Sequence, residues 1–148
     1  MIHKLKFEII TPERVVYKDE VDQITLPTAE GEITILPNHI PLVAVLRPGE
    51  IVAKKDGNEI AMSCSGGFIE VTPKKVVVLA DTAEKAEELV EEEILKARER
   101  AEQILKEKHI DSEKFAEAAA AMERELARLK VARKRSRART APSIKVEE

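Results

Sequence analysis

Aromatic side chains are scarce in this chain of 148 residues: they make up 3% of it, and tryptophan is absent. This scarcity excludes an aromatic cage or a base-stacking platform as the basis of ligand recognition. Hydrophobic residues nevertheless amount to 43% of the chain, which is enough for one core. That core must therefore be built from Val, Ile, Leu and Ala.

Cysteine is also scarce: Cys64 is the only one in the chain. One thiol cannot form an internal disulfide, so we expect a reducing compartment. A thiol enzyme is disfavoured, since His39 is the only histidine well placed to act as a base and no acidic group is specified to orient it. The sequence indicates instead that Cys64 fills a strand position and that Gly66 and Gly67 form a turn or a bulge.

Several other functional signals are missing. No apolar run approaches the roughly 20 residues that span a bilayer, and the first residues, MIHKLKFEIITPERV, lack the apolar centre of an export signal. Neither of the two glycine-rich phosphate-loop patterns occurs, and the histidines and the cysteine do not have metal-ligand spacing. We therefore expect a soluble, non-catalytic protein with no metal site.

The chain changes character near residue 80. Residues 1–80 hold all five glycines and six of the seven prolines. This half predicts nine short strands rich in β-branched residues, namely KLKFEII, RVVYKD, VDQITLP, GEITILP, LVAVL, GEIVAKKDG, NEIAMSC, GFIEVTP and KVVVLAD. Asp56-Gly57 or Gly57-Asn58 predicts a tight hairpin between two of them. Many short strands at even spacing are typical of a β-sandwich or a flattened barrel.

Residues 81 to about 139 contain neither glycine nor proline and are rich in strong helix formers. Apolar residues recur there at helical spacing on either side of a break at KHIDSEK. The first stripe is Val90, Ile94, Ala97, Ala101 and Ile104, and the second is Phe115, Ala118, Met122, Leu126 and Leu129. Asp111 or Ser112 is the expected N-cap of the second helix. Two such helices form an antiparallel hairpin.

The composition of the hairpin is compatible with two interpretations, an ordinary appendage and an arm that opens. Its inner faces are rich in alanine and bury little apolar area, so we expect it to be weakly held. We divide the chain into a sandwich over residues 1–83, a helical hairpin over 84–139 and a tail over 140–148. The tail shows no periodicity and contains Pro142, so the sequence predicts that it is disordered.

Charge is unevenly distributed along the hairpin. Residues 81–117 carry 13 acidic and 7 basic side chains, whereas residues 118–148 carry 9 basic and 4 acidic. The basic stretch at 126–139, LARLKVARKRSRAR, could contact nucleic acid, lipid or an acidic protein. The few aromatics and the Glu-rich first helix argue against nucleic acid as the target. A nucleic-acid or ribosome-associated protein that uses this basic stretch is therefore kept as the alternative function, in second place. A membrane-surface role would require more bulky apolar residues than this stretch offers.

Four motifs follow one another in an order typical of one family: EIITPERVVY, AEGEITILPNHIPLVAVLRPGEI, CSGGFIEV and VVVLADTAE. With the Ala/Glu/Lys-rich helix pair after them, the chain resembles the epsilon subunit of the bacterial F-type, rotary ATP synthases over residues 2 to about 135. The resemblance implies a sandwich of ten strands followed by a two-helix hairpin. It also implies a non-catalytic central-stalk subunit, peripheral on the cytoplasmic face of the bacterial plasma membrane and attached there only through the complex.

The resemblance also implies partners for the sandwich. It would hold the gamma stalk and sit on the ring of c subunits, so that both turn as one rotor of a proton-translocating synthase. By motif position, the residues that resemble the family's gamma contacts are Thr11, His39 and Ala44. The residues that resemble its c-ring contact are Glu30, Gly31 and Glu32.

The hairpin resembles the family's regulatory arm. When extended along gamma it would reach the catalytic beta and alpha subunits and inhibit ATP hydrolysis. Basic residues of the second helix would meet an acidic loop of beta, since opposite charges steer and hold a register. The residues that would fill this role are Arg124, Arg128, Arg133, Lys134 and Arg135.

One feature of the family is absent from the first helix. Several members bind ATP on the folded hairpin through the motif [IL]-D-x-x-R-A, and the aligned stretch here is LVEEEI, from Leu89 to Ile94. Val90 and Glu93 stand where Asp and Arg are expected, and Ile94 stands where Ala is expected. A glutamate in place of the arginine would repel phosphate, so we predict weak or no ATP binding and no cofactor. Calorimetry on the isolated chain tests this, and a submillimolar dissociation constant would contradict it.

Overall fold

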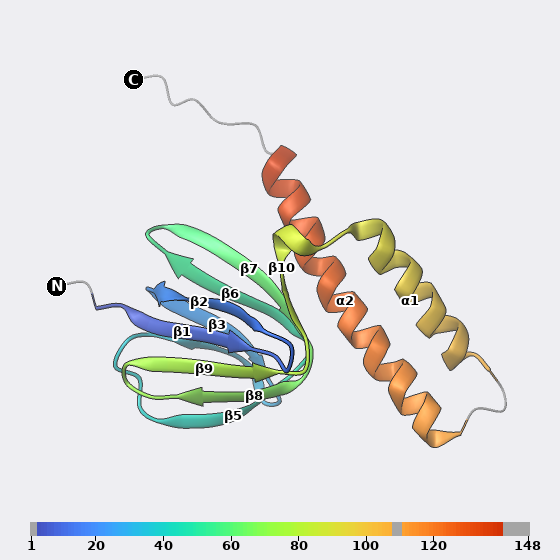
Figure 1. The fold of residues 1–148 in the computed structure, drawn as a ribbon, viewed down its shortest axis with the longest axis horizontal. Coiled ribbons are helices and arrows are strands. Elements are labelled where there is room, and N and C mark those ends of the chain that lie inside the picture. Colours follow the sequence, from blue (N-terminus) through green and yellow to red (C-terminus); the bar gives the residue numbers. More distant parts are fainter. Residues whose placement is uncertain (1–2, 108–110, 141–148) are drawn as a thin grey trace.

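The computed structural model describes residues 3–107 and 111–140, with side chains up to residue 137. A ten-stranded sandwich is followed by two helices that lie beside it (Figure 1), which confirms the expected fold. The strands are β1 (Leu5–Ile10), β2 (Val15–Val21), β3 (Gln23–Thr28), β4 (Gly31–Ile35), β5 (Leu42–Leu46), β6 (Gly49–Lys55), β7 (Asn58–Cys64), β8 (Gly67–Val71), β9 (Lys75–Ala80) and β10 (Ala83–Lys85). A short 3-10 turn, η1 (Ala86–Glu88), leads to α1 (Glu91–Leu105) and α2 (Ser112–Thr140). The tail predicted over 140–148 lies outside the described residues from 141 onward.

The strands form one sheet that folds over into two layers around a core (Figure 1). Its order is β10-β7-β6-β3-β5-β8-β9-β1-β2, with β4 paired to β3. Neighbouring strands are antiparallel, except that β1 runs parallel to β9. This parallel pair joins the hairpin of β1 and β2 to the rest of the sheet.

The sandwich core is aliphatic, as the composition predicts. Alternate residues of β1, namely Leu5, Phe7 and Ile9, are completely buried, because successive side chains of a strand point to opposite faces. The ring centroids of Phe7 and Tyr17 lie 5.5 Å apart, and among the described residues this is the one aromatic pair of the core. The described fold therefore depends on interdigitated Val, Ile and Leu rather than on large rings.

Cys64 is a buried structural residue at the end of β7. Its thiol lies 3.5 Å from the carbonyl oxygen of Arg47 and 3.6 Å from that of Gly49, and donates to them. Burial raises the pKa of the Cys64 thiol to about 12. The thiol is therefore protonated at neutral pH and is a poor nucleophile.

Two backbone features follow from the turn residues. Asp56 and Gly57 have φ values of 51° and 81°, so they form the β6–β7 hairpin turn, as the first of the two sequence alternatives predicts. Gly67 opens β8 between β5 and β9, and a Cβ there would collide with the backbone carbonyl of Leu79. At Gly66 the nearest atom to an added Cβ, the carbonyl oxygen of Leu46, would be 3.7 Å away. Close approach of a neighbouring strand thus explains the second glycine of the pair.

The junction between the sandwich and the helices differs from the expected one. β10 pairs with β7 through Lys85, two residues beyond the boundary at 83, and the first helix begins at Glu91 rather than near 84. Pairing with β7 overrides the helix propensity of this segment. The second helix begins as predicted, because the Asp111 carboxylate accepts a hydrogen bond of 2.8 Å from the backbone N–H of Lys114.

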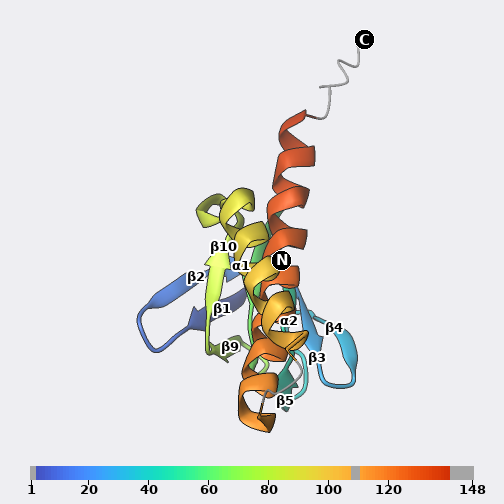
Figure 2. The same cartoon turned by 90° about the vertical axis from the view of Figure 1, so that its right-hand side faces the viewer.

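α2 lies between α1 and the sandwich and packs on β6 and β7 (Figures 1 and 2). Its buried residues therefore depart from the single predicted stripe. Phe115 and Leu126 are half-exposed, whereas Glu125, Val131 and Ala132 are buried. In the part of the chain that the structure describes, no helix combines the length and the apolarity that crossing a membrane requires.

Candidate functional site

One face of the sandwich exposes an apolar band that crosses five strands. Cross-strand pairing places its members side by side from β5 through β8, β9 and β1 to β2: Val45, Phe68, Leu79, Ile10 and Val15. Phe68 is 60% exposed, and Val45, Leu79 and Val15 are each more than half exposed. Single exposed apolar residues are normal, but a contiguous band of them marks a protein-interaction surface.

A hollow of about 590 Å³ lies along this apolar band and includes the predicted contact residue Thr11. It is lined by Thr11, Pro12 and the paired glycines at 66–67, together with Val45, Phe68, Leu79 and Ile10 of the band. Thr11 is buried and closes the β1–β2 turn, because its backbone N–H donates to the Arg14 carbonyl at 2.9 Å. The band is therefore a grooved surface with a rigid turn at one side.

The other two predicted gamma contacts lie elsewhere on or near β5. His39 lies in the loop before β5, where its Nδ1 is 2.6 Å from the carbonyl oxygen of Ile40. Asn38 has a φ of 63°. Its backbone N–H donates to the carbonyl oxygen of Pro73 at 2.9 Å, which fixes this loop against the β8–β9 turn. Ala44 belongs to β5 but is half-buried against the core. Val43, beside it on the same strand, points outward and is exposed.

The predicted c-ring residues lie at the tip of the β3–β4 hairpin, where Glu30 belongs to the turn and Gly31 and Glu32 begin β4. Glu30, Gly31 and Glu32 are all exposed. Gly31 has a φ of 118°, which favours glycine. The buried Thr28 hydroxyl donates to the Gly31 carbonyl at 2.5 Å and accepts from the Glu30 N–H at 3.3 Å. The chain therefore presents two carboxylates at the tip of a hairpin whose turn is held by hydrogen bonds.

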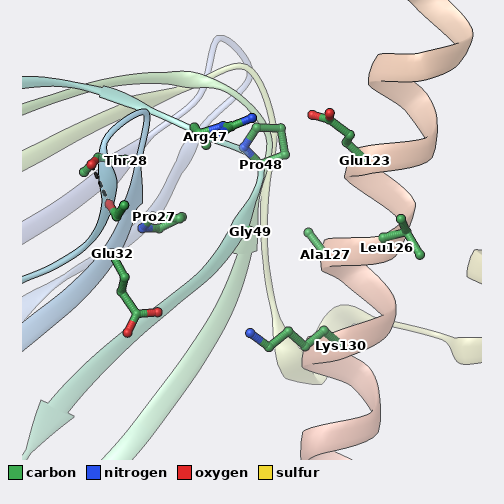
Figure 3. Close-up of a pocket in the computed structure, with 11 residues that line it drawn as sticks. Pro27, Thr28, Glu32, Arg47, Pro48, Gly49, Glu123, Leu126, Ala127 and Lys130 are labelled. Carbon is green, nitrogen blue, oxygen red and sulfur yellow. Dashed lines mark hydrogen bonds between the residues drawn. The ribbon is translucent and has the colours of Figure 1, made fainter.

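A crevice of about 470 Å³ separates this turn from the middle of α2 (Figure 3). On the sandwich side it is lined by Pro27, Thr28, Gly31, Glu32 and 47–49, and on the helix side by Glu123, Leu126, Ala127 and Lys130. Here the side chains of α2 and of the strands leave a hollow between them. The helix pair is thus incompletely sealed against the sandwich at this position.

All five predicted arm residues make polar contacts within the folded chain. Arg128 donates to Glu84 of β10 at 3.1 Å and to Glu125 of its own helix at 2.7 Å. The other four contacts are Arg124 to Glu125 at 3.3 Å, Arg133 to Glu91 at 3.2 Å, Lys134 to Glu50 at 3.2 Å and Arg135 to the Ala86 carbonyl at 3.1 Å. The basic side of α2 is therefore turned partly toward carboxylates of the sandwich and of α1.

The positions aligned with the family's ATP motif divide into two kinds. Leu89 and Ile94 are buried in a small cluster with Leu129 and other residues of α2. Val90 and Glu93 are exposed at the start of α1. Two of the four positions thus supply the apolar contact that holds the helices together.

Sequence reasoning missed the apolar band and the carboxylates that face the arm. The band follows from strand phase: once Ile69 and Val78 are assigned to the core, Phe68 and Leu79 must point outward. No comparable local signal identifies Glu84 as the partner of Arg128, because 44 positions separate them.

Comparisons with known proteins agree on one family. The family model described as "ATP synthase, Delta/Epsilon chain, beta-sandwich domain" matches residues 4–86. The chain is 46% identical to the ATP synthase epsilon chain of Dehalococcoides mccartyi over 132 residues, which cover 89% of this chain and 94% of that relative. It is 44% identical to the epsilon chain of Herpetosiphon aurantiacus, with coverage of 88% and 96%.

Solved structures show the same fold in more distant proteins. A chain of the Euglena gracilis mitochondrial ATP synthase, in an assembly of OSCP, F1 and c-ring, superposes with a TM-score of 0.73 at 24% identity and covers 84% of this chain and 78% of that one. A chain from the central stalk and c-ring of the Tetrahymena thermophila enzyme gives a TM-score of 0.58 at 17% identity, with coverage of 88% and 97%.

Proposed function

The chain belongs to the ATP synthase epsilon chain family, and on that premise we propose that it is a non-catalytic rotor subunit that joins the gamma stalk to the c ring and restrains ATP hydrolysis through its helical arm. The apolar band beside Thr11 is the observation that carries this proposal. It offers a wide, preformed surface of the kind that a permanent protein partner covers. Through the c ring, the subunit would sit on the cytoplasmic face of the bacterial membrane.

The β3–β4 turn supports the second contact of the proposed rotor. Its carboxylates at Glu30 and Glu32 are exposed, while Thr28 holds the backbone beneath them. A polar turn of fixed shape suits the hydrated surface of a membrane ring better than an apolar face would.

The way α2 is held supports the proposed arm. Its apolar contact with the sandwich involves small side chains, because among the described residues the partly buried apolar ones that pack against the cluster of Leu89, Ile94 and α2 residues are Ala61 of β7 and Ala86 of η1. The sandwich has a separate core of its own. The arm could therefore leave without unfolding the sandwich, and its basic residues would then be available to an acidic surface of the catalytic head.

Deletion of residues 89–148 is the direct test of the inhibitory role. We expect the truncated subunit to assemble normally, because the core of the sandwich lies outside the deleted segment. ATP hydrolysis by the reconstituted complex should rise severalfold, since nothing remains to block rotation. If hydrolysis is no faster than with the full chain, inhibition by the arm is wrong.

Alanine substitution of Arg128, Arg133, Lys134 and Arg135 should raise hydrolysis in the same direction but less completely. The remaining difference from the wild type should shrink as salt is added, because ionic strength screens exposed charge pairs. Assembly, followed by size-exclusion chromatography, is the control in both experiments.

A further inference from the structure

Carboxylates line the side of the sandwich that faces α2. Glu84 on β10 accepts a hydrogen bond from Arg128, and Glu50 on β6 accepts one from Lys134. Lys134 also lies 3.9 Å from Glu59 of β7. These strands are adjacent in the sheet, so we refer to Glu84, Glu50 and Glu59 together as the acidic edge.

The contact between Arg128 and the acidic edge is the most shielded of these pairs. The side chain of Arg128 is 21% exposed, that of Glu84 is 27% exposed and that of Glu125 only 3%. Arg128 donates through different nitrogens to the two carboxylates, so one guanidinium joins the arm's own glutamate to the sandwich. Charge-assisted hydrogen bonds in such partly dry sites are stronger than those of exposed ion pairs.

Apolar packing contributes little to the same interface. Among the described residues, the partly buried apolar side chains that pack against the cluster of the helices are Ala61 of β7 and Ala86 of η1, and alanine buries little area. On the neighbouring side α2 leaves the crevice described above. Ionic contacts therefore contribute to where α2 docks on the sandwich.

We propose that the acidic edge is an intramolecular docking site that occupies the basic residues of the arm and so competes with the acidic surface of the catalytic head. The competition, though not the docking, rests on the proposed inhibitory function. Arg128 cannot hold Glu84 and a distant acidic loop at once, so extension of the arm requires an exchange of carboxylates. The strength of the acidic edge thereby sets how readily the subunit inhibits.

The variant Glu84→Gln tests docking without changing the arm. It keeps the shape of the side chain and the backbone pairing of β10, but removes the charge that Arg128 meets. Spin labels on Glu20→Cys in β2 and Glu113→Cys in α2 report the position of the arm in the isolated full chain, since the protonated Cys64 is buried. We expect the population of open arms to rise about tenfold, the factor that loss of one charge-assisted hydrogen bond typically produces.

The matched control is Glu92→Gln. Glu92 pairs with Lys96 within α1 at 3.2 Å, so the variant makes the same change of charge within one helix, away from the acidic edge. Its distance distribution should equal that of the wild type. Glu50→Gln should open the arm less than Glu84→Gln, because its partner Lys134 is more exposed than Arg128. Unchanged distances in both Glu84→Gln and Glu50→Gln would overturn the docking site.

Hydrolysis by the reconstituted complex separates docking from competition. Glu84→Gln should inhibit more strongly than the wild type, because its arm is released with every basic residue intact. Arg128→Gln should also open the arm of the isolated chain but inhibit less. If Glu84→Gln opens the arm and leaves hydrolysis unchanged, the competition is overturned, whereas the docking measured by the spin labels does not depend on that result.

Discussion

Replacing Phe68 with glutamate is expected to weaken binding to the gamma stalk by about thirtyfold or more, the loss typical of a central aromatic contact. Phe68 lies within the apolar band, between Val45 and Leu79 on the neighbouring strands. A partner that covers this surface would bury the new carboxylate beside apolar side chains, which is costly without a counter-charge. Titration calorimetry of the subunit with purified gamma measures the change directly.

Phe115→Glu is the matched control for this prediction. Phe115 is exposed to a similar degree, but it lies in the first turn of α2, outside the apolar band. It should leave the affinity for gamma unchanged. Both variants should keep the melting temperature of the wild type, because neither side chain contributes to a buried cluster. Equal loss of affinity in the two variants, or none in Phe68→Glu, would rule out the apolar band as the gamma surface.

Gly67→Ala is expected to destabilise the sandwich by about 3 kcal/mol, at the upper end of the usual cost of overpacking. The added methyl group would collide with the backbone of Leu79 on β9. Backbone cannot rotate away as a flexible side chain does, so β8 and β9 must move apart and weaken their ladder. Urea unfolding followed by circular dichroism should show a lower midpoint.

Gly66→Ala provides the comparison at the adjacent position. There an added methyl group would make only an ordinary contact with the Leu46 carbonyl. We expect its stability to lie within about 1 kcal/mol of the wild type. If both variants lose the same stability, backbone flexibility rather than the close approach of β9 explains the glycine pair.

Most of the sandwich was predictable because its strands carry local signals. Segments such as KVVVLAD combine β-branched residues with flanking turn residues, and all nine expected segments form strands β1 to β9. The tenth strand was predictable only through the family resemblance. Ala83, Glu84 and Lys85 favour a helix by composition, and they become a strand because β7 offers them an unpaired edge.

The predicted arm residues were identifiable from the sequence, but their partners in the folded chain were not. The stretch ARKRSRAR is visibly basic in the sequence, and the acidic first helix was the nearest candidate to pair with it. In the structure, Arg133 does meet α1 at Glu91, whereas Arg128 and Lys134 meet β10 and β6. These pairs join residues that are far apart in the sequence. Hydrophobic periodicity predicts which face of a helix is buried, but not which strand that face packs against.

The parallel pairing of β1 with β9 also sets the order of events as the chain is synthesised. β2 is available to β1 almost at once, but the other edge of β1 has no partner until residues 75–79 have emerged. Such distant contacts form slowly, because a long loop must close first. Chains fold from the N-terminus as they leave the ribosome, and every strand of the sandwich emerges before the basic helix does. We therefore expect the arm to dock last, on the acidic edge of the sandwich.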